Sequence, residues 1–210
     1  MTENIRVFTQ SSIRIEAEDK IFYVDPFQIP EAFQDADFIF LTHDHYDHFS
    51  PEDLTKVMKE RSIIVAPENL AEQVLPLLPA HGRLVAVKPN TACETAGVFF
   101  ETVPAYNLQK DFHPKSAGWV GYILKAGGLR IYVAGDTDAT PEAQQVHCDI
   151  AMVPIGGTYT MDAKEAAALV NDIHPLVAIP IHYGSIVGKP EDAEVFKKAV
   201  HAPIHVELKL

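Results

Sequence analysis

A cluster of three histidines and two aspartates directly follows a short apolar segment and places the strongest constraint on the fold. The apolar segment, residues 37–42, has the length and composition of a strand that is buried on both faces. The cluster consists of His43, Asp44, His45, Asp47 and His48. Burying so many polar groups is costly unless they bind one another or a cation. The end of this strand must therefore lie where other segments can supply partners.

The residue types and their spacing in this cluster predict a metal site. Imidazole and carboxylate groups bind Zn²⁺, Mn²⁺, Fe²⁺ and Ni²⁺. Residues two apart in an extended segment share a face, so His43 and His45 can reach one ion. Asp47 and His48 lie beyond a bend, just before Ser50-Pro51, which is typical of a helix start, and can reach a second ion. We expect one or two divalent cations, with zinc favoured and manganese, iron or nickel as alternatives.

The order of patterns along the chain predicts an α/β protein. Alternating and apolar runs predict strands at 5–8, 12–17, 20–24, 63–66, 83–87, 92–94, 98–103, 118–124, 129–133, 150–154, 177–180 and 203–208. Helix formers and caps predict helices at 50–60, 67–78, from 141 onward, 162–173 and 190–200. Two sheets packed face to face with helices outside satisfy this order. Because no linker or repeat divides the chain, we expect a single domain over residues 1–210.

The charge balance limits the partners. The chain has 29 acidic and 17 basic residues and a net charge of −12 with neutral histidines. Such a surface repels polyanions, which argues against nucleic-acid binding. Bound cations would reverse the local field, so the expected small-molecule substrate can be anionic. No apolar run approaches ~20 residues and the start lacks a signal pattern. We therefore expect no membrane association and a cytoplasmic location, and a homo-oligomer stays open.

The cluster also resembles a known signature. The string Thr42-His43-x-His45-x-Asp47-His48 resembles that of the metallo-β-lactamase superfamily. Three further segments follow in the expected order along nearly the whole chain: Asp25-Pro26-Phe27, Ala134-Gly135-Asp136-Thr137 and Ile181-His182-Tyr183-Gly184. Within the superfamily the chain looks most similar to the L-ascorbate-6-phosphate-lactonase-like group of metal-dependent hydrolases. The resemblance implies a four-layer αβ/βα sandwich with the metal site at one edge of the two sheets.

The resemblance also implies a ligand set. His43 and His45 would bind a first ion, and Asp47, His48 and His182 a second ion. Asp136 would bridge the two. The residues themselves agree with this, because Asp136 and His182 each follow a predicted strand, where loops converge on sites. Asp47, His48 and Asp136 are the expected catalytic residues, with Asp47 orienting the nucleophile.

One position departs from the family pattern. The loop that usually carries another histidine reads Pro104-Ala105-Tyr106-Asn107. An amide oxygen is a weaker zinc ligand than imidazole. Either Asn107 itself or His113, six residues further on, can complete the first site. A single ion held by Asp47, His48, Asp136 and His182 is a further alternative.

Such a site predicts hydrolysis by a metal-activated water on a small ester, lactone or phosphorylated metabolite. Oxygen-reducing members of the superfamily have glutamate where His45 stands, which also favours hydrolysis. Two alternatives stay open, a phosphodiesterase or nuclease and a metal-binding protein with a degenerate catalytic site. Lys110 and Lys115 can pair with a phosphate or remain solvated. The loop around Tyr159 can form a wall of the site, and Thr160 can cap the helix that follows.

Overall fold

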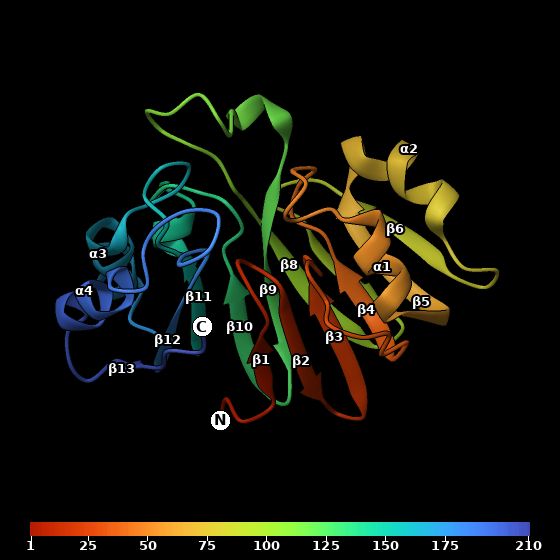
Figure 1. Cartoon of the computed structure of the whole chain (residues 1–210), viewed down its shortest axis with the longest axis horizontal. Coiled ribbons are helices and arrows are strands. Elements are labelled where there is room, and N and C mark those ends of the chain that lie inside the picture. Colours follow the sequence, from red (N-terminus) through yellow and green to blue (C-terminus); the bar gives the residue numbers. More distant parts are fainter.

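Two sheets packed face to face form the centre of the molecule in the computed structural model, which describes residues 1–210 (Figure 1). The first sheet has the strand order β1-β2-β3-β4-β5-β6. Its strands are β1 (Ile5–Val7), β2 (Ile13–Ala17), β3 (Lys20–Val24), β4 (Ala36–Phe40), β5 (Met58–Pro67) and β6 (Arg83–Val87). Antiparallel pairs join β1, β2 and β3, and parallel pairs join β3 to β6.

The second sheet is built entirely from the later part of the chain, with the order β13-β12-β11-β10-β9-β8-β7. Its strands are β7 (Ala92–Thr95), β8 (Val98–Pro104), β9 (Val120–Ala126), β10 (Leu129–Val133), β11 (Ile150–Pro154), β12 (Val177–Ile181) and β13 (His205–Val206). The strands β10 to β13 are parallel and β7 to β10 antiparallel. Each half of the chain therefore contributes one sheet.

The main core lies between the sheets and contains 24 buried hydrophobic residues from both of them. Alternation along each strand turns apolar side chains inward, as a period of two requires. Phe40 of β4 contacts Phe100 of β8 and Tyr122 of β9, with ring centroids 5.2 and 5.0 Å apart. The Tyr122 hydroxyl donates a hydrogen bond of 2.6 Å to the Leu41 carbonyl. The second sheet thus supports the residues that lead into the histidine cluster.

Helices cover the outer faces of both sheets (Figure 1). Helices α1 (Pro51–Val57) and α2 (Ala71–Val74) pack on the first sheet around a second apolar cluster that includes Leu54 and Ile64. Helices α3 (Ala163–Ile173) and α4 (Asp192–Ala199) pack on the second sheet around a third cluster. The layers are helix, sheet, sheet and helix, which confirms the predicted four-layer sandwich. No helix has the length and apolar character that crossing a bilayer requires.

The helix starts follow capping chemistry. Ser50 caps α1 by accepting from the Asp53 amide, and Pro51 occupies the first turn, as predicted. The α1 helix ends at Val57, earlier than expected, because Met58 already belongs to β5. Asp162, not Thr160, caps α3: its carboxylate accepts from two backbone amides while Glu165 accepts from the Asp162 amide. The Thr160 prediction was wrong.

Two other predicted helices are shorter than expected. The 67–78 segment forms 3₁₀ turns on either side of the four-residue α2. Pro76 has no amide hydrogen to continue α2, so the helix stops there. The segment after Pro141 forms only a 3₁₀ turn, Ala143–Gln145, because it must become extended again to reach β11.

Candidate metal centre

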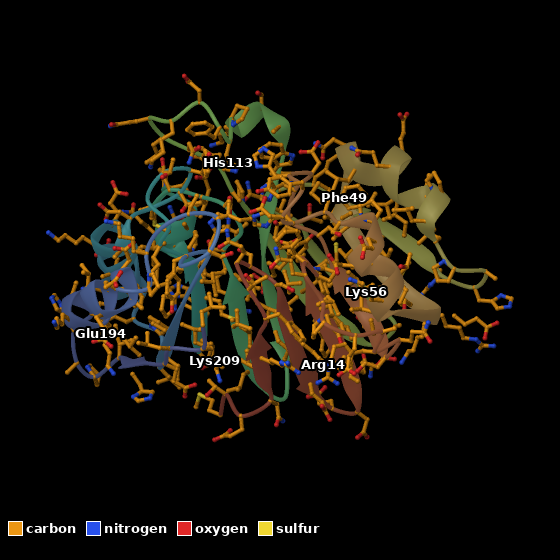
Figure 2. All side chains as sticks on the ribbon, in the orientation of Figure 1. Arg14, Phe49, Lys56, His113, Glu194 and Lys209 are labelled. Carbon is orange, nitrogen blue, oxygen red and sulfur yellow. The ribbon has the colours of Figure 1, made fainter.

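The predicted ligands meet at one edge of the sandwich, although they come from both sheets. The 43–48 loop follows β4, Asp136 follows β10 and His182 follows β12. His113, which is labelled in Figure 2, lies on the loop that joins β8 to β9. Gly135 allows the close approach next to Asp136: its φ is +67°, and a Cβ there would lie 3.1 Å from the Val120 carbonyl oxygen.

Three overlapping groups of side chains could hold a cation. They are His43, His45 and His113; His43, His48 and Asp136; and Asp47, His48 and His182. Within each group the ligand atoms lie within 4.8 Å of one another. The His43 Nε2 and His45 Nδ1 atoms are 3.1 Å apart, close to the ~3.3 Å expected for two nitrogens on one tetrahedral zinc. Asp44 is exposed and belongs to none of the groups.

Asp136 lies between the group that contains His113 and the group that contains His182. Its Oδ1 is 3.3 Å from His48 Nε2, and its Oδ2 is 3.3 Å from His182 Nε2 and 3.4 Å from His113 Nε2. The carboxylate therefore reaches histidines of both groups, which is the geometry expected of a bridging ligand.

Asn107 and His113, the two alternatives for completing the first site, lie one behind the other. His113 joins His43 and His45, whereas Asn107 lies behind His113. The Asn107 Oδ1 accepts from the His113 backbone amide (3.0 Å) and lies 3.1 Å from His113 Nδ1. Its Nδ2 donates to Asp138 Oδ1 (3.2 Å) and to the Tyr159 carbonyl (2.9 Å). Asn107 is therefore placed to orient His113, and the ligand role of either residue stays a prediction.

In three of the histidines the ring nitrogen that points away from the cluster, Nδ1, contacts a protein oxygen, while the inner nitrogen points toward the cluster. His48 Nδ1 lies 2.7 Å from Asp25 Oδ2, His43 Nδ1 lies 2.9 Å from Thr42 Oγ1, and His113 Nδ1 lies beside Asn107. Such contacts fix the tautomer and leave the inner nitrogen with a lone pair for a cation. In each of these three residues the inner nitrogen is Nε2, which faces the cluster.

Asp25 contacts a histidine of the cluster, although the sequence assigned it no role of its own. It is fully buried and accepts from the Thr42 amide (2.8 Å) and the Thr42 hydroxyl (2.6 Å) as well as facing His48. Its φ of +44° is unusual for a residue other than glycine and turns the carboxylate inward directly after β3. The signal in the sequence was an aspartate followed by proline at the end of a predicted strand.

Two of the histidines are neutral at neutral pH. Burial lowers the pKa of His43 well below its usual value, and the nearby His48 charge adds to this. Burial and the neighbouring His113 also lower the pKa of His45. Neutral imidazoles are the form that binds a cation.

The carboxylates of the cluster are ionised. Burial alone would raise the pKa of Asp136, but the charges on His182 and His48 outweigh it and hold that pKa well below its usual value. Burial likewise opposes ionisation of Asp47, yet the hydrogen bond from His182 lowers its pKa overall. Burial would lower the pKa of His48, but Asp136 and Asp25 hold it well above the usual value, so a cation would have to displace a proton from its Nε2.

The donor set fits a divalent cation. His48 Nε2, His113 Nε2 and Asp136 Oδ1 are buried and have no hydrogen-bond partner, although all three face the same cluster. Unpaired buried polar atoms are rare in native proteins and call for an explanation. Imidazole nitrogens with carboxylate oxygens are the ligands of zinc and of several other transition metals. A cation would satisfy all three atoms.

A cavity of about 350 Å³ opens above the cluster. Its floor includes Asp47, Asp136, His182 and His45, and its walls are Tyr46, Phe112, Tyr159 and Ile186. The wall residue Tyr159 confirms the predicted role of its loop. The indole of Trp119 lies beside the cluster, with its ring centroid 5.0 Å from those of His43 and His45, a contact that the sequence did not reveal.

Neither loop lysine faces this cavity. Lys110 Nζ contacts Asp138 Oδ1 at 2.6 Å, and Lys115 Nζ contacts Glu142 Oε1 at 2.7 Å. The structure thus places neither lysine in the lining of this cavity, and a pairing with substrate stays a prediction.

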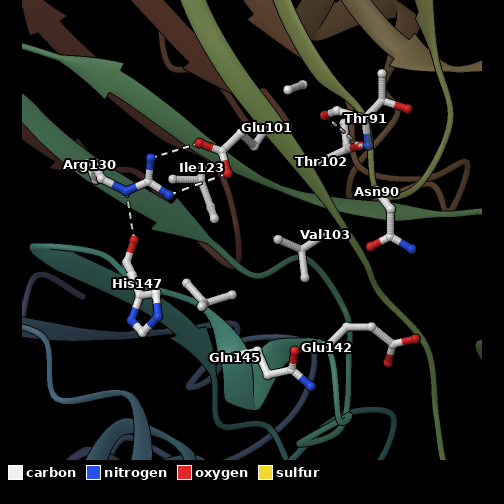
Figure 3. Close-up of a pocket in the computed structure, with 12 residues that line it drawn as sticks. Asn90, Thr91, Glu101, Thr102, Val103, Ile123, Arg130, Glu142, Gln145 and His147 are labelled. Carbon is white, nitrogen blue, oxygen red and sulfur yellow. Dashed lines mark hydrogen bonds and ion pairs between the residues drawn. The ribbon is translucent and has the colours of Figure 1, made fainter.

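A second cavity, of about 390 Å³, has no cluster residue in its lining (Figure 3). Its arginine, Arg130, contacts Glu101 at 2.7 Å and donates to the His147 carbonyl at 2.8 Å. The charge of Arg130 is thus neutralised within the protein, and no group of metal ligands lines this cavity.

The sandwich and the cluster at its edge define a metal-binding protein of the metallo-β-lactamase fold. The model of the Beta-lactamase superfamily domain matches residues 4–182. The chain belongs to this superfamily.

Similar proteins are metal-dependent hydrolases. The UPF0173 metal-dependent hydrolase of Pyrococcus abyssi is 31% identical over 211 residues, which cover 93% of this chain and 91% of the relative. A crystal structure from Parabacteroides distasonis, classed as a metal-dependent hydrolase, is 30% identical and has a TM-score of 0.82, covering 98% of this chain and 92% of that chain. Igni18, a metallo hydrolase from Ignicoccus hospitalis, is 20% identical with a TM-score of 0.75 over 97% of this chain and 93% of its own, which shows the fold alone. The predicted enzyme class, a metal-dependent hydrolase, is confirmed.

Proposed function

We propose that this metal-dependent hydrolase uses water to cleave a small ester, lactone or phosphorylated metabolite. The observation that supports the proposal is the convergence of five histidines and two aspartates from both sheets, of which His45, Asp47, Asp136 and His182 line one cavity. A buried cluster of this composition that also faces a cavity can bind a cation and a substrate side by side.

Each cluster residue has a role in this proposal. His43, His45 and His113 would hold a first cation, Asp47, His48 and His182 would hold a second, and Asp136 would serve both. Zinc is the proposed ion, because histidine nitrogen is the commonest donor here. When bound, the cations supply the electrophile that acidifies a water molecule and polarises the scissile bond.

The protein itself positions the water and moves its proton. Asp47 lines the cavity and its Oδ2 lies 3.3 Å from His182 Nε2 and 3.6 Å from His48 Nε2. It is therefore placed to hold a water at the cavity floor and to accept its proton. Asp25 and Asn107 keep the rings of His48 and His113 in one orientation, so that little reorganisation accompanies the reaction.

The two alternatives from the sequence receive less support. No lysine or arginine lines the cavity, which does not favour a nuclease or phosphodiesterase. His113 groups with His43 and His45 and could replace the histidine expected at position 107, which does not favour a degenerate site. The likeness to the L-ascorbate-6-phosphate-lactonase-like group remains a proposal, as do a small-molecule partner, a cytoplasmic location and a homo-oligomer.

Paired histidine variants test the proposal. We expect purified protein to contain up to two equivalents of divalent metal and to turn over p-nitrophenyl esters or bis(p-nitrophenyl) phosphate. His48→Ala should lose metal and activity together, because His48 contacts both aspartates of the cluster. His201→Ala is the matched control, since His201 is exposed and lies outside every ligand group. Retention of metal and turnover by His48→Ala would refute the proposal.

A further inference from the structure

The walls of the cavity above the cluster are apolar and partly exposed, unlike its floor. The wall residues are Tyr46, Phe112, Tyr159 and Ile186. Tyr46 is 66% exposed, Phe112 48% and Ile186 39%, which is unusual for large apolar side chains gathered in one place. Such a patch beside a polar centre marks a site that takes an apolar group.

The walls are held in place by the same loop that supplies a cluster histidine. Phe112 directly precedes His113, and its ring meets that of Tyr159 edge to face, with centroids 4.6 Å apart at 88°. The Tyr159 carbonyl accepts a hydrogen bond from Asn107, which also faces His113. The wall and the cluster therefore form one built unit, and not a chance contact between surface side chains.

The cavity also lacks a cationic side chain that could pair with a negatively charged group of the substrate away from the scissile bond. None of its lining residues is a lysine or an arginine, and Asp47 and Asp136 add negative charge at the floor. The nearest loop lysines, Lys110 and Lys115, are paired with Asp138 and Glu142. A substrate with a phosphate or carboxylate away from the scissile bond would have no cation to face along these walls.

The volume bounds the size of the substrate. About 350 Å³ is at the lower end of the range for small-molecule sites and suits a compact molecule.

From these observations we infer that the enzyme acts on small esters or lactones that carry an uncharged alkyl or aryl group, bound between Phe112, Tyr159 and Ile186. This inference rests on the proposed hydrolase function and selects the carbonyl substrates among those it allows, against phosphorylated ones.

A series of hydroxamic acids tests the inference by binding, without the need for turnover. Acetohydroxamic, butanohydroxamic and hexanohydroxamic acids share one metal-binding head and differ in chain length. N-hydroxysuccinamic acid has the same head with a terminal carboxylate. We expect calorimetric titration of the metal-loaded protein to show affinity rising about fourfold for each buried CH₂. N-hydroxysuccinamic acid should bind more weakly than butanohydroxamic acid.

A matched pair of phenylalanine variants assigns the effect to the cavity wall. Phe112→Ala should reduce the gain to about twofold per CH₂ by removing wall contacts, without changing the affinity for acetohydroxamic acid. Phe99→Ala is the control, because Phe99 is 47% exposed and lies on β8 outside this cavity. Phe99→Ala should leave the whole series unchanged.

The outcomes separate the inference from the proposed function. Equal affinity at every chain length, or tighter binding of the succinamic acid, overturns the inference and leaves the hydrolase function to the His48→Ala test. Loss of the chain-length effect in Phe99→Ala as well overturns the assignment to this wall. Absence of metal-dependent binding for every hydroxamate overturns both the inference and the proposed function.

Discussion

Asn107 should determine how tightly the first cation is held, because it contacts His113. Its side chain contacts the amide and Nδ1 of His113 on one side and Asp138 and the Tyr159 carbonyl on the other. Asn107→Ala removes all these contacts while leaving His113 present. The His113 ring can then rotate, and its inner nitrogen no longer faces His43 and His45 in one orientation.

The size of the effect follows from the contacts. Loss of an outer-shell partner of a metal-binding histidine typically weakens metal affinity by about 10- to 100-fold, or ~1.4–2.8 kcal/mol. Asn107 is only 8% exposed, so its removal also leaves buried polar groups without partners. We expect a loss of about 2–4 kcal/mol in the free energy of unfolding.

Two further variants separate metal affinity from stability. Asn107→Asp keeps an acceptor for His113 but places a second carboxylate beside Asp138, so it should lower stability while retaining metal affinity. Asn171→Ala removes an asparagine that also has two hydrogen bonds, to the Ala199 carbonyl and from the His201 amide, far from the cluster in the chain. This control should lower stability by about 1–2 kcal/mol without affecting the metal.

The assay is competition for zinc against a chromophoric chelator, with urea unfolding in parallel. In Asn107→Ala the affinity for only one of the two zinc equivalents should fall, because Asp47, His48 and His182 do not contact Asn107. Wild-type affinity for both equivalents in Asn107→Ala, or an equal loss in Asn171→Ala, would refute the reasoning.

Three other expectations concern stability and reactivity. Asp53→Asn should lower the free energy of unfolding by about 1–3 kcal/mol at neutral pH, because the Asp53 carboxylate accepts hydrogen bonds from Lys56 and from the backbone amides of 28–29. Burial alone would raise the pKa of Asp53, but the Lys56 hydrogen bond lowers it overall, so the ionised carboxylate stabilises the fold above its unfolded pKa. The difference between wild type and variant in urea melts should therefore disappear as the pH falls through the folded pKa. Burial raises the pKa of the Cys148 thiol to about 12, so only about one thiol in 10⁴ is ionised at pH 8 and iodoacetamide should label Cys93 first by mass spectrometry; faster labelling of Cys148 would contradict this. Protein saturated with metal, at a free ion concentration ~1,000-fold above the Kd, should melt on the order of 10 °C higher than the same protein treated with a chelator. An unchanged melting curve would mean that no cation joins the sheets.

Local patterns predicted much of this fold. Strands such as β3 and β11 match their predicted bounds, since alternation and apolar runs act within a few residues. Helix lengths were less predictable, because they depend on where a neighbouring strand must begin, as Met58 shows at the end of α1. Capping was ambiguous at α3, where Thr160 and Asp162 both have suitable side chains and only the backbone path decides between them.

The site was predictable in composition but not in every role. The 43–48 loop, Asp136 and His182 could be identified because each follows a strand and matches the family pattern. Which of Asn107 and His113 faces the cluster depends on how their loop folds back on itself, and a loop of this kind has no periodic signal in the sequence. The cavity walls are hidden for the same reason, since Phe112, Tyr159 and Ile186 come from separate loops.

The division of the sheets between the two halves of the chain has a consequence for how the protein acquires its metal. Residues 5–87 form one sheet and carry the 43–48 loop, whereas His113, Asp136 and His182 arrive with the sheet formed by residues 92–206. A nascent chain that has completed only its first half holds an unfinished coordination shell. Each of the three ligand groups includes a residue from the second half, so none is complete until the two sheets have docked.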